Sequence, residues 1–182
     1  MITKILLILI LLIPVMSYSD YITPSKEDIA VQQLIERAHY WVKVLEMKAP
    51  PYRWGKEGIE GGDCSGQYHW IMKKAGAPFP RSTAFAMYHG AWPGFNRSTW
   101  QDASFPDGIY FSWKKPADHV GIVDFRTDNP ERLNFVESSK GAGKFRKSSL
   151  KKGSSYDMKF LGVRVLDLSV GLGKTKLDSI NK

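Results

Sequence analysis

The sequence predicts an α+β domain in which helices come first and an antiparallel β-sheet follows. Apolar residues recur at helical spacing over residues 25–46 and 63–75, and from residue 108 onward the period changes to two. Helices followed by adjacent strands are typical of the α+β class. With 182 residues and 43% hydrophobic residues, the chain has the size and composition of one ordinary domain with a core.

The first predicted helix runs from about Ser25 to Glu46. Ser25 and Asp28 have the spacing of a capping box, and a proline pair at 50–51 ends the helix. A second helix is predicted over residues 63–75, with Asp63 as its N-cap and Gly76 at its end.

The remaining elements are shorter. A helical stretch is predicted over residues 82–89, and residues 90–107 are rich in Gly, Pro and Trp, which predicts an irregular surface loop. The candidate strands are 108–113, 119–125, 133–139 and 160–168.

The chain begins with the pattern of a secretory signal peptide. Lys4 precedes an apolar run from Ile5 to Met16, and small residues follow up to Ser19. A spanning helix needs roughly 18 apolar residues, so cleavage after Ser19 is favoured over an uncleaved anchor. We therefore expect a protein exported to the periplasm or the medium. The expected division is 1–19 signal peptide, 20–168 folded domain and 169–182 polar tail.

The net charge of +8 favours anionic surroundings such as envelope polymers. No motif of a nucleic-acid-binding module is present, so we expect no nucleic-acid partner, and we expect a monomer. The single cysteine excludes zinc sites of the paired-cysteine kind, and we expect no metal and no cofactor.

Cys64 is the first candidate for chemistry. A lone cysteine in an exported chain has no partner for an internal disulfide, so it is either a small buried core residue or a reactive thiol. If Asp63 caps the helix, Cys64 lies in the first turn, where unsatisfied N–H groups and the helix dipole favour a thiolate. Position alone leaves both readings open.

A thiolate peptidase also needs a base that later protonates the leaving amine. Of the four histidines, His119 opens the strand 119–125, a position from which a base can face a helix end. A histidine that starts a strand is often structural, so the assignment depends on its neighbours.

Glu137 is the candidate to orient that imidazole. If the strands 119–125 and 133–139 form a hairpin that pairs Val120 with Val136, His119 stands opposite Glu137. A carboxylate there would stabilise the imidazolium, as the third member of a triad does. A register slip of two residues would leave only a diagonal contact, and a plain surface role for Glu137 stays open.

Several short motifs occur in a fixed order along the middle of the chain: Tyr52-Arg53-Trp54-Gly55, Gly62-Asp63-Cys64-Ser65-Gly66, Pro80-Arg81-Ser82, His119-Val120-Gly121-Ile122-Val123 and Phe135-Val136-Glu137-Ser138-Ser139. Together they resemble the signature of the NlpC/P60 family of cell-wall endopeptidases over about residues 50–145. The resemblance implies a papain-like α+β fold, with the helix that carries the nucleophile packed against an antiparallel sheet.

The resemblance also implies an exported cysteine endopeptidase that hydrolyses peptidoglycan stem peptides between D-γ-glutamate and a diamino acid. Carried over by position, Cys64 is the nucleophile, His119 the base and Glu137 the orienting residue. Tyr52 helps to form the oxyanion site. The implied substrate-binding residues are Asp63, Ser65, Trp54 and Arg81. Asp63 and Ser65 would contact the free amino end of the substrate, and Asp63 can cap the helix as well.

The chain departs from the family pattern at several positions. Gly55-Lys56 stands where the family has a glycine pair, and Glu137 stands where histidine is commoner. Alternative functions are another papain-like amidase, an acyltransferase, or a non-catalytic wall-binding protein. The sequence does not separate the enzymatic alternatives, because loops form the walls of the pocket.

Overall fold

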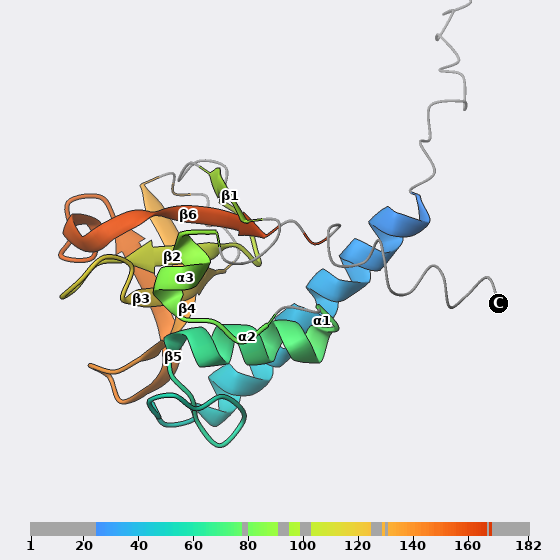
Figure 1. Ribbon diagram of the computed structural model, residues 1–182, viewed down its shortest axis with the longest axis horizontal. Helices are drawn as coiled ribbons and strands as arrows, with labels where there is room; N and C mark the ends of the chain where they lie inside the picture. The colour runs from blue at the N-terminus through green and yellow to red at the C-terminus, as the bar shows by residue number, and fades with distance from the viewer. Residues whose placement is uncertain are drawn as a thin grey trace, which may run out of the picture.

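The computed structural model describes residues 25–77, 80–90, 95–98, 103–124, 129, 131–166 and 168 (Figure 1). The predicted signal peptide and polar tail lie outside these residues. In chain order the elements are α1 (Lys26–Lys48), α2 (Cys64–Ala75), α3 (Ala84–Tyr88), β1 (Phe95–Ser98), β2 (Gly108–Phe111), β3 (His119–Val123), β4 (Arg132–Ser139), β5 (Lys144–Lys151), a single 3-10 turn (Asp157–Lys159) and β6 (Phe160–Leu166).

The strands form a six-stranded sheet in the order β1-β6-β2-β3-β4-β5, and every neighbouring pair is antiparallel. Helices α1 and α2 pack against each other, and α2 lies against β3 and β4 (Figure 1). The α+β class with helices on an antiparallel sheet is therefore confirmed.

Both faces of the sheet are buried. On the helix side, side chains such as Tyr110, Val120 and Val136 pack with Leu34, Leu45 and Ile71 from the helices. On the opposite side, a second cluster contains Ile109, Phe111, Val123, Phe135 and Leu150, with Tyr156 and Phe160 packed against it. Period-two alternation along β2, β3 and β4 supplies one cluster from odd positions and the other from even positions.

The start of α1 agrees with its sequence signal. The Ser25 hydroxyl accepts a hydrogen bond from the Asp28 N–H at 3.1 Å, and the Asp28 carboxylate accepts one from the Ser25 N–H at 3.0 Å. The helix ends at Lys48, two residues beyond the predicted Glu46, and Ala49 closes it with a left-handed φ of 44°. None of the described helices is both long enough and apolar enough to cross a membrane.

Two strands were not predicted. Residues 95–98, placed in an irregular loop by the sequence, form β1 and pair with β6 from Phe95↔Leu166 to Ser98↔Val163. Strand β5 has the sequence KFRKSSLK, in which only Phe145 and Leu150 are buried, so the pattern lacks the alternation that marks a strand. Its partner β4 makes it a strand, through eight consecutive residue pairs.

The predicted hairpin register between β3 and β4 was wrong by two residues. Ile122, and not Val120, pairs with Val136, and Val123 pairs with Phe135. The observed pairs are symmetric about residue 129, whereas the predicted pair of Val120 with Val136 is symmetric about residue 128. The Asn129 carbonyl accepts from the Arg132 N–H at 3.1 Å, and its side chain accepts from the Glu131 N–H at 2.9 Å. An asparagine whose side chain binds the backbone two residues on favours a turn.

Candidate active site

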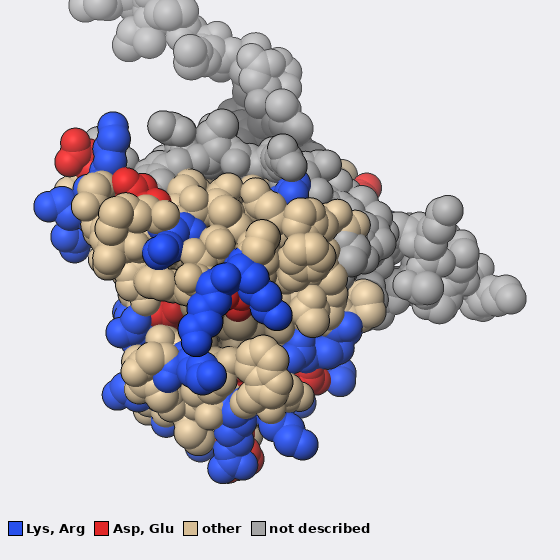
Figure 2. Space-filling model, turned by 60° about the vertical axis from the view of Figure 1, so that its left-hand side comes forward, with Lys and Arg blue, Asp and Glu red and all other residues tan. Residues whose placement is uncertain are grey.

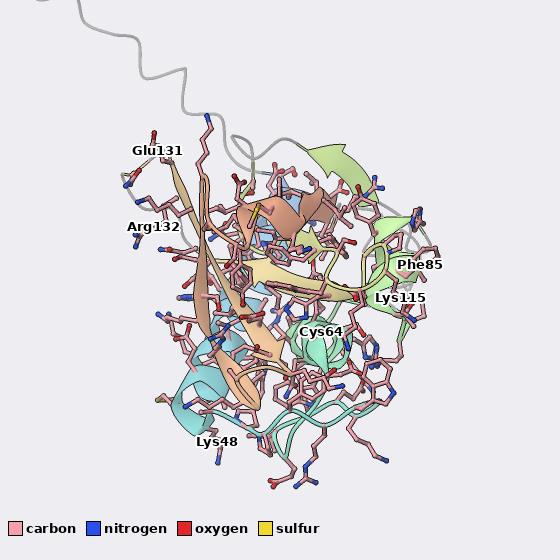
Figure 3. The ribbon with its side chains drawn as sticks, turned by 90° about the vertical axis from the view of Figure 1, so that its left-hand side faces the viewer. Lys48, Cys64, Phe85, Lys115, Glu131 and Arg132 are labelled. Atoms are coloured by element: carbon pink, nitrogen blue, oxygen red, sulfur yellow. The ribbon has the colours of Figure 1, made fainter. Side chains whose placement is uncertain are left out.

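Cys64 is the first residue of α2 and is 8% exposed. Asp63 is the N-cap, as predicted, and its carboxylate accepts a hydrogen bond from the Gly66 N–H at 2.6 Å. The thiol therefore lies in the first helical turn, where the partial positive charge of the helix end favours a nearby anion. Figure 3 looks onto this end of α2.

The loop before α2 is clamped onto that first turn. The Lys56 carbonyl accepts from the Asp63 N–H at 3.0 Å, and Gln67 binds both the N–H and the carbonyl of Gly58. A Cβ at Gly66 would come within 2.1 Å of the Lys56 carbonyl oxygen, so only glycine permits this close approach. The clamp fixes where the Cys64 backbone begins the helix.

The Asp63 carboxylate gathers several donors. Besides Gly66 it accepts from the Gly55 N–H at 2.8 Å and from Nη2 of Arg81 at 2.9 and 3.1 Å. Ser65 Oγ donates to Asp63 at 3.2 Å and accepts from Nη1 of Arg81 at 2.9 Å. Asp63, Ser65 and Arg81 are three of the predicted substrate-binding residues, and they thus form one hydrogen-bonded cluster.

His119 opens β3, and its Nε2 lies 2.5 Å from Oε2 of Glu137. Burial by itself lowers the pKa of His119. The hydrogen bonds to Cys64 and Glu137, with the negative charges of both, outweigh burial and raise the pKa to about 9. Because Nε2 binds the carboxylate, Nδ1 is the ring nitrogen left for the thiol. The arrangement stabilises the protonated imidazolium.

The contact between His119 and Glu137 is diagonal. The observed register, continued along the two strands, sets Glu137 opposite Gly121, two residues from His119. Diagonal neighbours on one face lie about 7–8 Å apart at Cα, within reach of long side chains. The predicted pair is therefore in contact even though the predicted register was wrong.

Glu137 is 2% exposed and has a full set of partners. Its Oε1 accepts from Arg146 Nε at 3.0 Å, from Ser148 Oγ at 2.5 Å and from the Tyr156 hydroxyl at 3.1 Å. Burial raises the pKa of Glu137, but the hydrogen bond and charge of His119, with Ser148 and Arg146, lower it to about 2. The carboxylate is therefore ionised at neutral pH.

Sequence reasoning missed Arg146, Ser148 and Tyr156. Arg146 stands directly opposite Glu137 in the pairing of β4 with β5, and Ser148 follows two residues along. The available sequence signal was the alternate spacing of Arg146 and Ser148, which places both polar side chains on one face of a strand. The signal could not be used because the strand itself was not recognised.

Tyr52 and Trp54 line a cleft of about 630 Å³ beside His119. Burial raises the pKa of the Tyr52 phenol well above its usual value, and the negative charges of Cys64 and Asp63 add to the effect. The hydroxyl therefore stays protonated and can donate a hydrogen bond to a developing oxyanion. Trp54 is 78% exposed, with its ring free to contact a ligand.

Residues 49–164 match the NlpC/P60 family. No curated protein matches the chain in a sequence comparison. Among solved structures, an NLP/P60-family protein similar to a lipoprotein from Staphylococcus aureus is 21% identical with a TM-score of 0.52, covering 81% of this chain and 45% of its own. NlpC2 from Trichomonas vaginalis is 21% identical with a TM-score of 0.54, covering 78% and 49%.

A third structure, Ly7917 with the hydrolyzing product of MDP, is 14% identical with a TM-score of 0.51 and covers 72% of this chain and 62% of its own. The chain thus spans about half the length of the first two proteins and less than two thirds of the third. At these identities the likeness shows the fold. The family match covers well over half of the chain, and the chain therefore belongs to the NlpC/P60 family, whose members are typically cysteine peptidases of the cell wall.

Proposed function

We propose that this protein is an exported cysteine endopeptidase that hydrolyses peptidoglycan stem peptides between D-γ-glutamate and a diamino acid. The observation that carries the proposal is that His119 hydrogen-bonds both Cys64 and Glu137 beside an open cleft, in a chain of this family. A wall-binding protein without activity would not need a thiol, an imidazole and a carboxylate in contact.

The chemistry follows from the geometry. The Cys64 thiolate attacks the amide carbon, and the carbonyl becomes an oxyanion that the Tyr52 hydroxyl stabilises. The His119 imidazolium gives its Nδ1 proton to the leaving amine as the C–N bond breaks, which leaves a thioester on Cys64. The neutral imidazole then takes a proton from water, and the resulting hydroxide attacks the thioester, which releases a carboxylic acid and the thiolate.

Glu137 acts on the imidazole and not on the substrate. Its carboxylate fixes the ring through Nε2 and stabilises the positive charge while Nδ1 faces the thiol. Asp63, Ser65 and Arg81 have a first role in holding the N-terminus of α2. Contact of Asp63 and Ser65 with the free amino end of the substrate is part of the proposal.

Two further observations support the substrate class. Ly7917, a protein of similar fold, was crystallised with the hydrolyzing product of MDP. The sequence of residues 1–19 has the pattern of a signal peptide, which would bring the enzyme to the wall. Amino-terminal sequencing of protein recovered from the envelope or the medium should begin at or near Asp20. Protein that retains Met1 in the cytoplasm would contradict export.

Digestion of purified muropeptides with mass analysis of the products tests the scissile bond. We expect products with a free γ-carboxyl on D-glutamate and a free amine on the diamino acid, and Cys64→Ala protein should give none. Release of intact peptides from the glycan would identify an amidase instead. Transfer of the acyl group to an added amine, without hydrolysis, would identify an acyltransferase.

A further inference from the structure

Three lysine side chains stand around the cleft. Lys114 and Lys115 come from the loop between β2 and β3, and Lys140 comes from the turn between β4 and β5. All three are exposed, and within the described part of the chain none of them forms an ion pair. Their charges are available to a ligand in the cleft.

The two carboxylates that line the same cleft form hydrogen bonds with groups other than the lysines. Glu137 binds His119 and Arg146. Asp118 accepts hydrogen bonds from three successive backbone N–H groups, those of residues 113–115, at 2.8, 2.9 and 3.3 Å. Burial raises the pKa of Asp118, but these backbone hydrogen bonds outweigh burial and lower it, so the group is ionised. In the described part of the chain, neither acid forms an ion pair with the three lysines.

The lysine-bearing loop is held in place. Asp118 ties down its backbone, and Ser112 Oγ donates to the Lys115 carbonyl at 3.2 Å. Trp113 packs edge-on against Tyr156, with ring centroids 5.0 Å apart, and Tyr156 donates to Glu137. The loop backbone is therefore anchored to the residues that orient the base, which keeps Lys114 and Lys115 at the cleft.

The cleft as a whole has an excess of positive charge. Its cationic side chains are Lys114, Lys115, Lys140 and Arg146, against the carboxylates of Asp118 and Glu137. Figure 2 shows basic side chains across the middle of the visible face, with small acidic areas between them. Figure 3 shows Lys115 on the side of the molecule onto which the Cys64 end of α2 opens. A ligand with carboxylates fits this field.

We propose that these three lysines bind carboxylates of the peptide on both sides of the scissile bond, so that the enzyme prefers stem peptides with free carboxylates over amidated ones. The inference rests on the proposed function. A glutamate linked through its γ-carboxyl keeps a free α-carboxylate next to the bond that is cut, and the residues beyond the bond carry carboxylates as well. Amidation removes each charge while hardly changing the size of the group.

The effect per lysine is modest because the groups are exposed. Ion pairs of exposed side chains correspond to a change of up to roughly fivefold each. For the three together we expect a preference on the order of tenfold in kcat/KM. Salt should reduce the preference, since the Debye length shortens from about 30 Å at 0.01 M to about 8 Å at 0.15 M.

The test uses the full mature protein and two matched synthetic stem peptides. One has free carboxylates on D-γ-glutamate and on the residues beyond the bond, and the other has the corresponding amides. The free-carboxylate peptide should be cleaved about tenfold faster at low salt. Replacement of Lys114, Lys115 and Lys140 by glutamine should bring the two rates close together, while thermal melting confirms the fold. The matched control is Lys48→Gln at the end of α1, which is not among the residues that line the cleft and should retain the full preference.

The outcomes separate the two proposals. Equal cleavage of both peptides by the wild-type protein overturns the inference and leaves the proposed function standing. A preference that survives in the folded triple variant also overturns it, because another group must then be responsible. Cleavage of neither peptide by wild-type protein with a reactive Cys64 overturns the proposed function itself.

Discussion

The site contains two buried carboxylates, each paired with an arginine. In the helix cluster, Asp63 lies with Ser65 and Arg81 at the start of α2. In the sheet cluster, Glu137 lies with Arg146, Ser148 and Tyr156 on the strands and the segment that follows them. Asp63 is 6% exposed and Glu137 2%.

The two clusters differ in what their carboxylates hold. Asp63 accepts from the backbone N–H groups of Gly55 and Gly66, so it fixes the path of the chain. Every donor to Glu137 is a side chain, and one of them is His119. The same chemical motif therefore supports the backbone under the nucleophile in one region and controls a proton in the other. Substitutions in the two clusters should have different signatures.

Cys64 follows Asp63 in the chain and hydrogen-bonds His119, so it is adjacent to both clusters. Its replacement should have the largest effect on hydrolysis. Cys64→Ala removes the nucleophile, so hydrolysis should fall by roughly 10⁴-fold or more while the fold is kept. Muropeptide digestion and thermal melting of the same sample measure the two properties. Iodoacetamide should inactivate the wild-type protein. Activity that persists in the variant would place the nucleophile elsewhere and remove the reason for the comparison.

Glu137→Ala should cost about 10²–10⁴-fold in kcat, because the imidazole loses both its alignment and its counter-charge. Glu137→Gln keeps a hydrogen-bond acceptor and loses the charge, so partial activity should remain. The variants are compared with the wild type by kcat/KM measured across pH.

The direction of the pH effect follows from the pKa of His119, which is raised to about 9 from an ordinary value of 6.5. The imidazolium required for the thiolate–imidazolium pair is present below this pKa and is lost as the pH rises through it. The alkaline limb of the wild-type profile should therefore lie near pH 9. In Glu137→Gln the supporting charge is gone, so the limb should move to lower pH. An unchanged limb would mean that Glu137 positions the ring without stabilising its charge.

The two arginines sharpen the comparison because each pairs with a different carboxylate. Arg146→Met should lower kcat by roughly tenfold, since Glu137 loses a charged donor and holds His119 less firmly. Its alkaline limb should not move down, because removal of a nearby positive charge favours the imidazolium.

Arg81→Met is the matched variant in the helix cluster. It should lower thermal stability and leave the pH profile unchanged, since Arg81 binds Asp63 and Ser65 and not the imidazole. If Arg81→Met shifts the alkaline limb as strongly as Glu137→Gln does, the functional separation of the clusters is wrong.

Asp63→Ala should show the smallest catalytic effect of the acid variants, together with a measurable loss of stability. Loss of an N-cap costs about 0.5–2 kcal/mol, which urea unfolding can detect. If Asp63 also binds the free amino end of the substrate, cleavage of peptides with a free amine should weaken more than cleavage of blocked ones. An equal loss for both would assign Asp63 to the helix cap alone.

Local chemistry let the sequence predict much of this site. The Asp63 cap, the first-turn position of Cys64 and the helix end at Gly76 depend on neighbours within a few residues, so short motifs were enough. The strand that starts at His119 and the strand that ends at Ser139 were likewise visible from their apolar alternation. Each of these features is determined by contacts that are near in sequence.

The sheet cluster required tertiary structure. Arg146 and Ser148 lie on a strand whose own sequence is mostly polar and which exists because it pairs with β4. Tyr156 reaches Glu137 from a turn nineteen positions along the chain. The register of β3 against β4 also came from the structure, which pairs Ile122 with Val136 and not Val120 with Val136.

The sequence by itself determined on which kind of element each proposed catalytic residue lies, because caps, periodicity and turn residues act over short distances. Only the tertiary structure decided how a buried glutamate stays ionised beside a histidine. That outcome needs an arginine, a serine and a tyrosine brought from outside its own strand to replace the water that burial removes.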